Sequence, residues 1–254
     1  MKTLFVGQNS IHLKSVDSTN SYATELLRQI KPVEGSVIYT FEQQNGRGQR
    51  GNSWESEPNK NVALSVILYP AFLTTDNQFL LNKITSLAIA DLMAEMLLNS
   101  GKSNIVKIKW PNDVYVDKQK IAGVLIENSL RENSIQSTVI GIGMNINQSE
   151  FAVELKNPVS LKMLEGIDFD LKNCVEKLCE YMEARYLQLK TNKVEKINTD
   201  YLNCLYQYNE WYSYKINSEI VNGKIIGVSL FGKLQVLFES NEIKEFDLKE
   251  IEFL

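Results

Sequence analysis

Histidine and cysteine are scarce in this chain of 254 residues, which has one histidine and three cysteines. A Ser-His-Asp triad or a multi-histidine zinc site would depend entirely on His12, which stands near the start in a segment that favours a strand. Cys174, Cys179 and Cys204 form no C-x-x-C pair. Cys174 and Cys179 lie in a stretch with helical periodicity, where a free thiol packs as a small apolar group. Hydrolysis by a triad or by a protein-bound metal ion is therefore disfavoured.

Long apolar runs and a basic excess are also missing. The longest apolar stretches, such as residues 61–70, fall far short of the roughly 20 residues that a membrane-spanning helix needs. Lys and Arg total 27 against 31 Asp and Glu, a formal net charge of −4, whereas a general nucleic-acid binder carries a basic excess. The first residues lack the apolar core and cleavage site of a signal peptide. We therefore expect a cytoplasmic protein that binds neither a membrane nor nucleic acid.

The composition is that of a globular protein, with 44% hydrophobic and 23% charged residues. Apolar periodicity predicts helices over about 18–30, 75–98, 170–190 and 194–206, and strands over about 36–41, 61–69, 106–110, 114–116, 121–127 and 137–142. From Trp211 onward short strands follow, with a strong hairpin signal at Asn222-Gly223 and a second break at Phe231-Gly232. The predicted fold class is α+β: a mixed sheet with helices over residues 1–208 and a small β-barrel over residues 209–254.

Residues 46–51, Gly-Arg-Gly-Gln-Arg-Gly, form a polar loop that matches the pattern G-x-G-x-x-G. No helical period follows, as a dinucleotide-binding turn requires, and the next strand has Ser65 where a kinase has its lysine. Three glycines still let the backbone approach a ligand closely, and Arg47 and Arg50 offer forked donors for phosphate or carboxylate. The alternative is a solvated surface loop that binds nothing.

Lysines cluster around the turn Trp110-Pro111-Asn112-Asp113: they are Lys107, Lys109, Lys118 and Lys120. A hairpin would bring Lys109 and Lys120 near Asp113. Ammonium groups beside one aspartate suit an anionic substrate whose charge grows during a reaction. The alternative is that these lysines form the solvated face of a strand.

Four segments, taken in order, resemble the biotin protein ligase family: residues 18–20 (Ser-Thr-Asn), 43–54, 109–113 (Lys-Trp-Pro-Asn-Asp) with 120–123 (Lys-Ile-Ala-Gly), and 141–147. The glycine-arginine loop is shared with many unrelated proteins, but Lys-Trp-Pro-Asn-Asp is highly specific, and the resemblance covers nearly the whole chain. It implies a biotin/lipoate-ligase-like catalytic domain followed by an SH3-like barrel. It also implies that biotin and Mg-ATP give biotinyl-5′-AMP, from which biotin passes to one lysine of a biotin carboxyl carrier protein.

The resemblance assigns roles to individual residues. Lys120 lies between the biotin carboxyl group and the phosphate, Arg47 is a second catalytic cation, and Asp113 orients or deprotonates the acceptor amine. The implied biotin-binding residues are Ser18, Thr19, Asn20, Gln43, Arg47, Gly48, Gln49, Lys120, Gly123 and Leu125. The implied ATP- and adenylate-binding residues are Arg47, Arg50, Trp54, Asn112, Lys120, Gly141 and Asn145, with Trp54 against the adenine. No residue is assigned to a metal, because the ATP phosphates are expected to hold Mg²⁺.

The chain departs from the family pattern at Gln49 and Asn52, where arginine is frequent, so two charges are missing from the loop. No helix-turn-helix precedes Ser18, so repression of transcription is not expected. Three alternatives stay open: a lipoate- or octanoate-type ligase, a non-catalytic module that binds biotin or an adenylate, and a nucleic-acid-binding barrel. The Lys-Trp-Pro-Asn-Asp segment favours biotin, and the presence of both Lys120 and Asp113 favours catalysis. Nothing in the sequence decides between a monomer and a homodimer.

Overall fold

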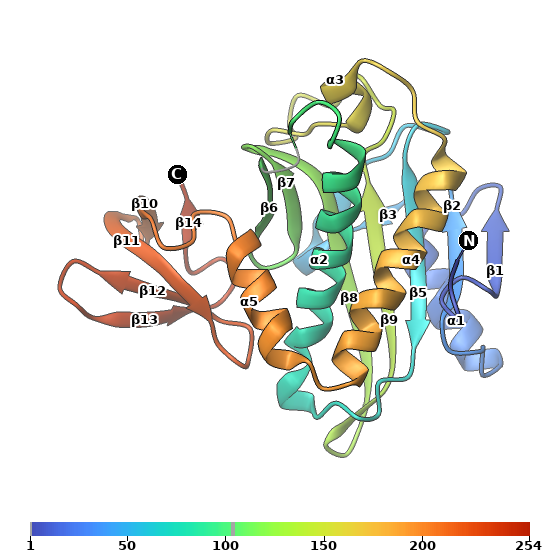
Figure 1. Ribbon diagram of the computed structural model, residues 1–254, viewed down its shortest axis with the longest axis horizontal. Helices are drawn as coiled ribbons and strands as arrows, with labels where there is room; N and C mark the ends of the chain where they lie inside the picture. Colours follow the sequence, from blue (N-terminus) through green and yellow to red (C-terminus); the bar gives the residue numbers. More distant parts are fainter. Residues whose placement is uncertain (1, 103–104) are drawn as a thin grey trace.

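The computed structural model describes residues 2–102 and 105–254 and is built around a seven-stranded mixed sheet (Figure 1). In their order across the sheet the strands are β1 (Ser10–Leu13), β2 (Ser36–Thr40), β5 (Val62–Leu68), β9 (Ser134–Met144), β8 (Gln119–Arg131), β7 (Asp113–Val116) and β6 (Val106–Lys109). β1 pairs with β2 in parallel, and the other neighbouring strands pair antiparallel. The α+β class that the sequence predicts is confirmed.

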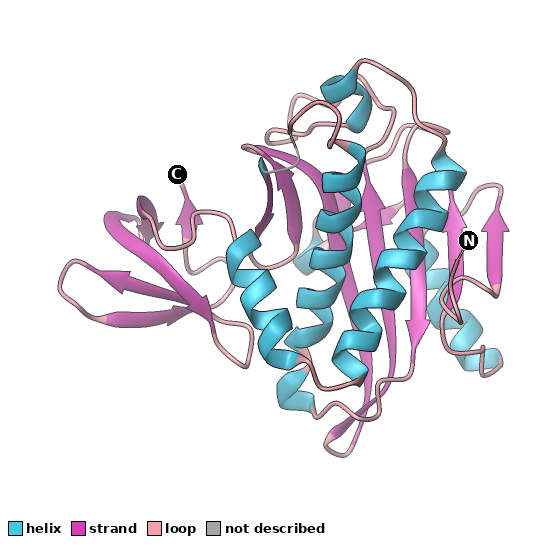
Figure 2. Ribbon diagram, viewed as in Figure 1, coloured by secondary structure: helices cyan, strands magenta, loops and turns pink. Residues whose placement is uncertain are grey.

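Helices cover both faces of this sheet (Figure 2). The covering helices are α1 (Thr19–Gln29), α2 (Phe79–Met96), α4 (Leu171–Lys190) and α5 (Val194–Cys204); the short α3 (Leu161–Glu165) lies beyond the strand ends, and the 3-10 turns are η1 (Gln49–Gly51) and η2 (Thr75–Asn77). α2 is buried on nearly all sides because it packs on the sheet and is flanked by α4 on one side and α5 on the other (Figure 1). On the opposite face, α1 buries Ala23 against Ile38, Ile67 and Val139. The four predicted helices are thus confirmed, with the predicted helix over 75–98 divided into η2 and α2.

The first residues of α1 are buried in the interior. Ser18 has an extended backbone, and its hydroxyl accepts a hydrogen bond from the Ser21 N–H at 3.4 Å, which caps the helix. Ser18, Thr19 and Asn20 are only 4%, 3% and 3% exposed, although all three are polar. Buried polar side chains need hydrogen-bond partners, so this helix start has to be part of a polar network.

The segment predicted as a loop over residues 43–60 has a small amount of regular structure. β3 (Gly46–Arg47) and β4 (Ser53–Trp54) pair antiparallel, with η1 between them. Gly46 has to be glycine because a Cβ there would overlap the Trp54 carbonyl oxygen. The glycine-arginine loop is therefore a short hairpin that carries Trp54 on its returning strand.

A second sheet of five strands follows α5. Its order is β13 (Ile243–Phe246), β12 (Leu234–Phe238), β11 (Glu219–Val228), β10 (Trp211–Ile216) and β14 (Glu252–Phe253). In the described residues β13 and β14 remain the two edges, so strand pairing does not close the predicted barrel; β14 is only two residues long. The Trp110 indole N–H donates to the Gly232 carbonyl at 2.8 Å, which joins the small sheet to the larger one.

The hairpin predicted at Asn222-Gly223 is wrong. Both residues lie inside β11, and the chain turns instead at Asn217 and Ser218, whose φ values are 49° and 72°. A Cβ at Gly223 would come within 2.6 Å of Val236, so the glycine serves close packing against β12. The second predicted break is confirmed, since Gly232 has φ 85° in the connection between β11 and β12.

None of the helices within residues 2–102 and 105–254 combines the length and the apolar character that a membrane crossing requires.

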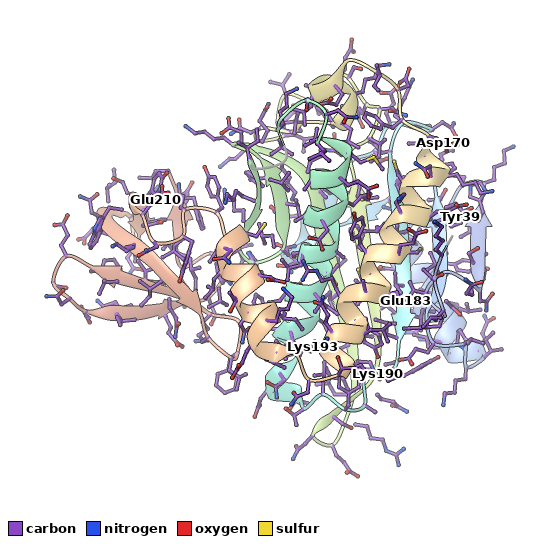
Figure 3. The ribbon with its side chains drawn as sticks, in the orientation of Figure 1. Tyr39, Asp170, Glu183, Lys190, Lys193 and Glu210 are labelled. Carbon is purple, nitrogen blue, oxygen red and sulfur yellow. The ribbon has the colours of Figure 1, made fainter. Side chains whose placement is uncertain are left out.

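The N-terminal segment is fastened to α4 by one carboxylate. Glu183, labelled on α4 in Figure 3, is 5% exposed. Its Oε1 accepts from the Leu4 N–H at 2.7 Å, and its Oε2 accepts from the N–H groups of Phe5 and Val6 at 2.7 and 3.0 Å. One side chain therefore satisfies three successive backbone donors in residues 4–6, which belong to no helix or strand.

We predict that Glu183→Gln lowers the free energy of unfolding by about 1–3 kcal/mol, because an amide keeps one acceptor oxygen and leaves a backbone donor without a partner. Urea denaturation followed by tryptophan fluorescence measures the change. Glu180→Gln is the matched control, since Glu180 accepts an exposed bond from the Lys2 N–H at 2.9 Å. Equal effects of the two substitutions would contradict the special role of Glu183.

Candidate active site

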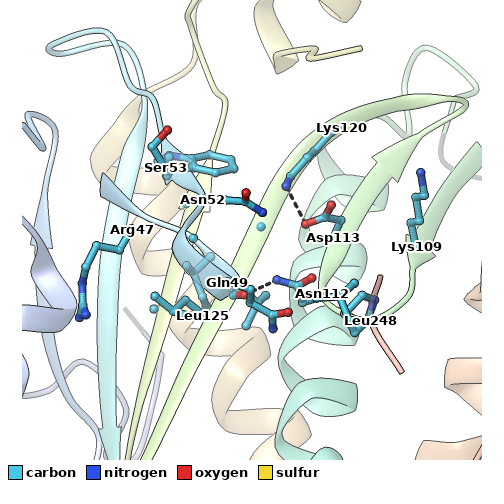
Figure 4. A pocket seen from close by; sticks show the side chains of 18 of the residues that line it. Arg47, Gln49, Asn52, Ser53, Lys109, Asn112, Asp113, Lys120, Leu125 and Leu248 are labelled. Carbon is cyan, nitrogen blue, oxygen red and sulfur yellow. Dashed lines mark hydrogen bonds and ion pairs between the residues drawn. The ribbon is translucent and has the colours of Figure 1, made fainter. Parts of the chain in front are cut away.

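A cavity of about 500 Å³ opens where the two sheets meet (Figure 4). Its wall is formed by the start of α1, the β3–β4 hairpin, β8, β9, the turn before β7 and the last residues of the small sheet. Most of the candidate residues line this one cavity: Ser18, Thr19, Asn20, Gln43, Arg47, Gly48, Gln49, Trp54, Asn112, Asp113, Lys120, Gly123, Leu125 and Gly141. Asn145 is not among the lining residues, and the Arg50 side chain lies outside the described part of the chain.

Lys120 and Asp113 form an ion pair at the centre of the cavity wall. The Lys120 Nζ lies 2.7 Å from the Asp113 Oδ1, as the dashed line in Figure 4 marks, and the side chains are 31% and 23% exposed. The β7–β8 hairpin brings them together, with a register shift between Val114 and Tyr115. The hairpin that the sequence analysis expected near Asp113 is therefore present.

The turn before β7 is tied to β8 by Asn112. The Asn112 amide donates to the Val124 carbonyl at 2.6 Å, and the Val124 N–H donates to the Asn112 carbonyl at 3.0 Å. Asn145 supports Lys120 from a buried position outside the cavity. It is 4% exposed and donates to the carbonyls of Lys120 and Val159 at 3.4 and 3.1 Å. Both asparagines thus hold the backbone that carries Asp113 and Lys120.

The Trp54 indole lies across glycines of β8 and β9. A Cβ at Gly143 would overlap the Trp54 ring, and a Cβ at Gly123 would be 3.1 Å from it. The Lys120 Nζ is 5.6 Å from the centre of the same ring. The Trp54 Nε1 is buried without a hydrogen-bond partner in the described residues. The strands therefore provide a flat glycine surface on which an indole, with its donor unused, forms part of the cavity.

A buried polar network lies beneath the start of α1. The Thr19 N–H donates to the Gln43 Oε1 at 2.9 Å, and the Ser65 hydroxyl lies 2.8 Å from the Thr19 Oγ1 and 2.6 Å from the Asn20 Oδ1. The Asn20 amide donates to the Leu125 carbonyl at 3.2 Å and to the Glu127 Oε2 at 2.8 Å. Gly141 makes room for Asn20, whose amide a Cβ there would overlap.

Arg47 is not directed toward the Lys120–Asp113 pair. Its Nη2 lies 2.9 Å from the Glu127 Oε2, and Figure 4 shows its side chain pointing away from Lys120. The backbone of Arg47 belongs to β3 at the edge of the cavity, so the residue is at the site while its guanidinium is held by a carboxylate.

Several cavity residues received no individual role from the family resemblance, although the sequence had placed Lys109 in the lysine cluster near Asp113. Lys109 lies between two rings, with its Nζ 5.0 Å from the centre of the Tyr115 ring and 4.8 Å from that of Phe253. Burial lowers the pKa of Lys109, and the nearby cations Lys120 and Lys156 lower it further. Its place in the Lys-Trp-Pro-Asn-Asp segment was the available signal. Other lining residues without an assigned role include Asn52, Ser53, Lys156, Leu248, Lys249, Ile251 and Glu252.

A protein-held metal centre is not seen in residues 2–102 and 105–254, where no three His, Cys, Asp or Glu side chains gather in a way that could bind an ion. The cavity combines cations, the carboxylates of Asp113 and Glu252, and the flat ring of Trp54. Such a set can bind an anionic, aromatic ligand and stabilise charge that develops on it.

Residues 12–145 match the model of the biotin/lipoate A/B protein ligase family. The bifunctional ligase/repressor BirA of Bacillus spizizenii is 30% identical over 196 residues, which are 76% of this chain and 58% of that protein. The biotin–[acetyl-CoA-carboxylase] ligase of Paracoccus denitrificans is 34% identical over 138 residues, 53% of each chain.

A solved biotin protein ligase from Aquifex aeolicus, in complex with biotin and ATP, has a TM-score of 0.77 to this chain. It is 27% identical, and the match covers 97% of this chain and 99% of that one. The alignment thus spans about 58% of the first curated relative but nearly the whole of the solved one. This chain belongs to the biotin/lipoate A/B protein ligase family.

Proposed function

We propose that this protein activates biotin with ATP to biotinyl-5′-AMP and then transfers the biotinyl group to a lysine of a biotin carboxyl carrier protein. The observation that carries the proposal is the 2.7 Å ion pair of Lys120 and Asp113 in the same cavity as Trp54 and the start of α1. Relatives named as biotin ligases, one of them solved with biotin and ATP, support the same substrates.

The first step joins two anions. A carboxylate oxygen of biotin attacks the α-phosphorus of ATP, and pyrophosphate leaves with the electron pair of the broken P–O bond. Fixed cations offset the repulsion between the two anions without a reorganisation cost. We assign this role to Lys120, which Asp113 orients, and to Arg47, which has to exchange Glu127 for the substrate.

The second step needs a neutral amine. A lysine with a pKa near 10.4 loses its proton at pH 7 at a cost of about 4.6 kcal/mol. Asp113 is assigned to accept that proton or to orient the amine. The amine nitrogen then attacks the biotinyl carbonyl carbon, an amide forms, and AMP leaves with the electrons of the anhydride bond.

The other residues are proposed to bind rather than react. Ser18, Thr19, Asn20, Gln43, Gly48, Gln49, Gly123 and Leu125 would hold biotin, and Arg50, Trp54, Asn112, Gly141 and Asn145 would hold the nucleotide. Asn145 would act through the backbone of Lys120, to whose carbonyl it donates. Mg²⁺ would arrive with the ATP phosphates, and no step is assigned to it.

The two sheets would have different roles in the reaction, with the boundary between them near residue 208. Residues 1–208 would carry the reacting groups, and residues 209–254 would add a wall to the nucleotide end of the cavity. A cytoplasmic location is part of the proposal, because the reaction would consume ATP and modify a carboxylase subunit.

The direct test is biotin-dependent exchange of labelled pyrophosphate into ATP by the purified chain with Mg²⁺. We expect exchange with biotin and little with lipoate or octanoate, since a site built around hydrogen bonds rejects ligands that lack the matching groups. Exchange with octanoate or lipoate but not with biotin would instead establish the lipoate-type alternative. Biotin binding without exchange would establish a non-catalytic module.

The roles of Lys120 and Asp113 can be separated by half-reaction. Lys120→Ala should reduce adenylate formation about 100-fold or more. Asp113→Asn keeps an oxygen for the Lys120 ammonium but loses basicity, so adenylation should change little while transfer to a carrier protein falls about 100-fold. Rapid-quench measurement of each half-reaction provides the rates. The control is Lys118→Ala, because Lys118 is exposed on the same hairpin. Equal loss of both half-reactions in Asp113→Asn would refute the division of labour.

The glycine surface under Trp54 predicts a nucleotide effect. Gly143→Ala places a methyl group where the Trp54 indole lies, so the ring has to move. We expect the KM for ATP to rise about tenfold with a smaller change in the KM for biotin, as a misplaced aromatic face loses its stacking contribution. Steady-state exchange measures both constants. Gly227→Ala is the control, because a Cβ there meets only the flexible Gln235 side chain. A change confined to biotin would contradict the assignment.

A further inference from the structure

A continuous chain of hydrogen bonds runs beneath the cavity from Glu127 on β8 to Gln43 before the β3–β4 hairpin. It passes through Asn20 and Thr19 of α1 and through Ser65 of β5. Ser65 is fully buried and Thr19 and Asn20 are 3% exposed, so water has little access to its middle. The direction of each hydrogen bond in this chain is therefore decided by the protein.

The direction starts at Glu127. A carboxylate that is paired with a guanidinium has only acceptor atoms, so the group facing it must donate. The Glu127 Oε2 lies 2.9 Å from the Arg47 Nη2 and 2.8 Å from the Asn20 Nδ2. The Asn20 amide nitrogen is thereby turned to Glu127, where it also donates to the Leu125 carbonyl at 3.2 Å, and the Asn20 oxygen is turned to Ser65.

The orientation of Asn20 in turn determines which hydrogen bond the Ser65 hydroxyl donates. The hydroxyl has one hydrogen, and the Asn20 Oδ1 at 2.6 Å can only accept it. The second contact of Ser65, at 2.8 Å to the Thr19 Oγ1, then has to use the hydrogen of Thr19, which the longer 3.4 Å contact between the Thr19 Oγ1 and the Gln43 Oε1 competes for only weakly. Because the Thr19 hydroxyl donates inward to Ser65, only its lone pairs remain for a ligand in the cavity that Thr19 lines.

The Gln43 amide is oriented to present a donor to the cavity, whereas the Thr19 hydroxyl presents an acceptor. The Gln43 Oε1 accepts the Thr19 backbone N–H at 2.9 Å, which leaves its Nε2 as the end that can donate to a ligand. Thr19 and Gln43 both line the cavity. Side by side they offer one acceptor and one donor, which is complementary to an N–H next to a C=O.

We infer that Ser65 and Glu127 are positioning residues that fix an acceptor at Thr19 and a donor at Gln43, and that this pair selects the N–H and C=O edge of a cyclic urea. The inference rests on the proposed function and deepens it, since the head group of biotin is a cyclic urea. A dithiolane ring has neither an N–H nor a C=O, so it would leave both groups unpaired. Buried polar groups that stay unpaired cost more than the bond itself contributes, which makes such a site strongly selective.

The first arm of the test is Ser65→Ala in the full chain, assayed by biotin-dependent pyrophosphate exchange. The Thr19 hydroxyl then loses its inward acceptor and is free to turn. We expect the KM for biotin to rise about tenfold while kcat and the KM for ATP stay within about twofold, because the group acts on binding of the head group only. Ser86→Ala is the matched control, since Ser86 is a fully buried serine whose hydroxyl has no partner in the described residues.

The second arm is a double-mutant cycle with Thr19→Val, which removes the hydroxyl but keeps the shape. If Ser65 acts through Thr19, then Ser65→Ala should add less than about twofold to the KM of Thr19→Val. Fully additive effects, or a Ser65→Ala variant with unchanged KM, would overturn the inference. Both results are read against the activity of the unmodified chain with biotin, whose absence would refute the proposed function itself.

The third arm tests the origin of the direction at Glu127. Glu127→Gln introduces a donor that can reverse the Asn20 amide and, through Ser65, the Thr19 hydroxyl. We expect the KM for biotin to rise about tenfold, as in Ser65→Ala, because the cavity then offers a donor where an acceptor is needed. Since Glu127 also pairs with Arg47, the variant is measured in the Thr19→Val background as well, where it should add less than about twofold to the KM. Glu132→Gln, on the exposed tip of the same β8–β9 hairpin, is the control. A Glu127→Gln variant with wild-type KM would contradict the assignment of Glu127.

Discussion

The position of the Lys120 ammonium above the cavity is the constraint on which the site depends. An ammonium on a flexible four-carbon chain is useful at a reacting centre only if its backbone and its head are both held. The head is held by Asp113 at 2.7 Å. The backbone is held on β8, where the Lys120 carbonyl accepts from the Val159 N–H at 2.9 Å and from the Asn145 amide at 3.4 Å. A fixed charge of this kind needs no reorganisation when an anionic ligand arrives.

Glycine supplies the space that these fixed groups require. Three positions on β8 and β9 face bulky partners: Gly123 and Gly143 lie under the Trp54 indole, and Gly141 lies against the Asn20 amide. Because β8 and β9 pair directly, with Gly123 opposite Gly143, the strands form a patch without side chains in the middle of the sheet. Sheet strands seldom afford such a patch, since glycine weakens a strand interior. Its presence indicates that close approach of side chains to the backbone is required here.

The sequence predicts local features well because they follow from short-range periodicity. The ranges of α1, α4 and α5 and of the shorter strands agree with their apolar patterns, whereas β8 and β9 extend at both ends beyond the predicted 121–127 and 137–142. The resemblance also brings together segments that are far apart in the chain, and most of them line one cavity. It does not predict the partner of Arg47, since Glu127 lies 80 residues away and belongs to no motif that the sequence analysis used.

The turn-forming dipeptide gave a wrong prediction at a position where close packing between strands requires a glycine. Asn222-Gly223 is a strong hairpin dipeptide, but Gly223 is needed inside β11 next to Val236, and the left-handed positions of the turn were taken by Asn217 and Ser218. The role of Ser65 was not predicted either, because a single serine in an apolar strand has no pattern of its own. Its importance follows only from the two polar side chains that the fold places against it.

The Lys-Trp-Pro-Asn-Asp segment is specific because it joins three parts of the molecule at once. Lys109 extends between Tyr115 and the Phe253 ring of the small sheet, and the Trp110 indole donates to Gly232 of the same sheet. Asn112 ties the turn to β8, and Asp113 meets Lys120 in the cavity. Substitution of any one of these residues therefore alters a different contact. A surface lysine strand would need none of these contacts, so the alternative in which the lysines form a solvated face does not fit Lys109 or Lys120.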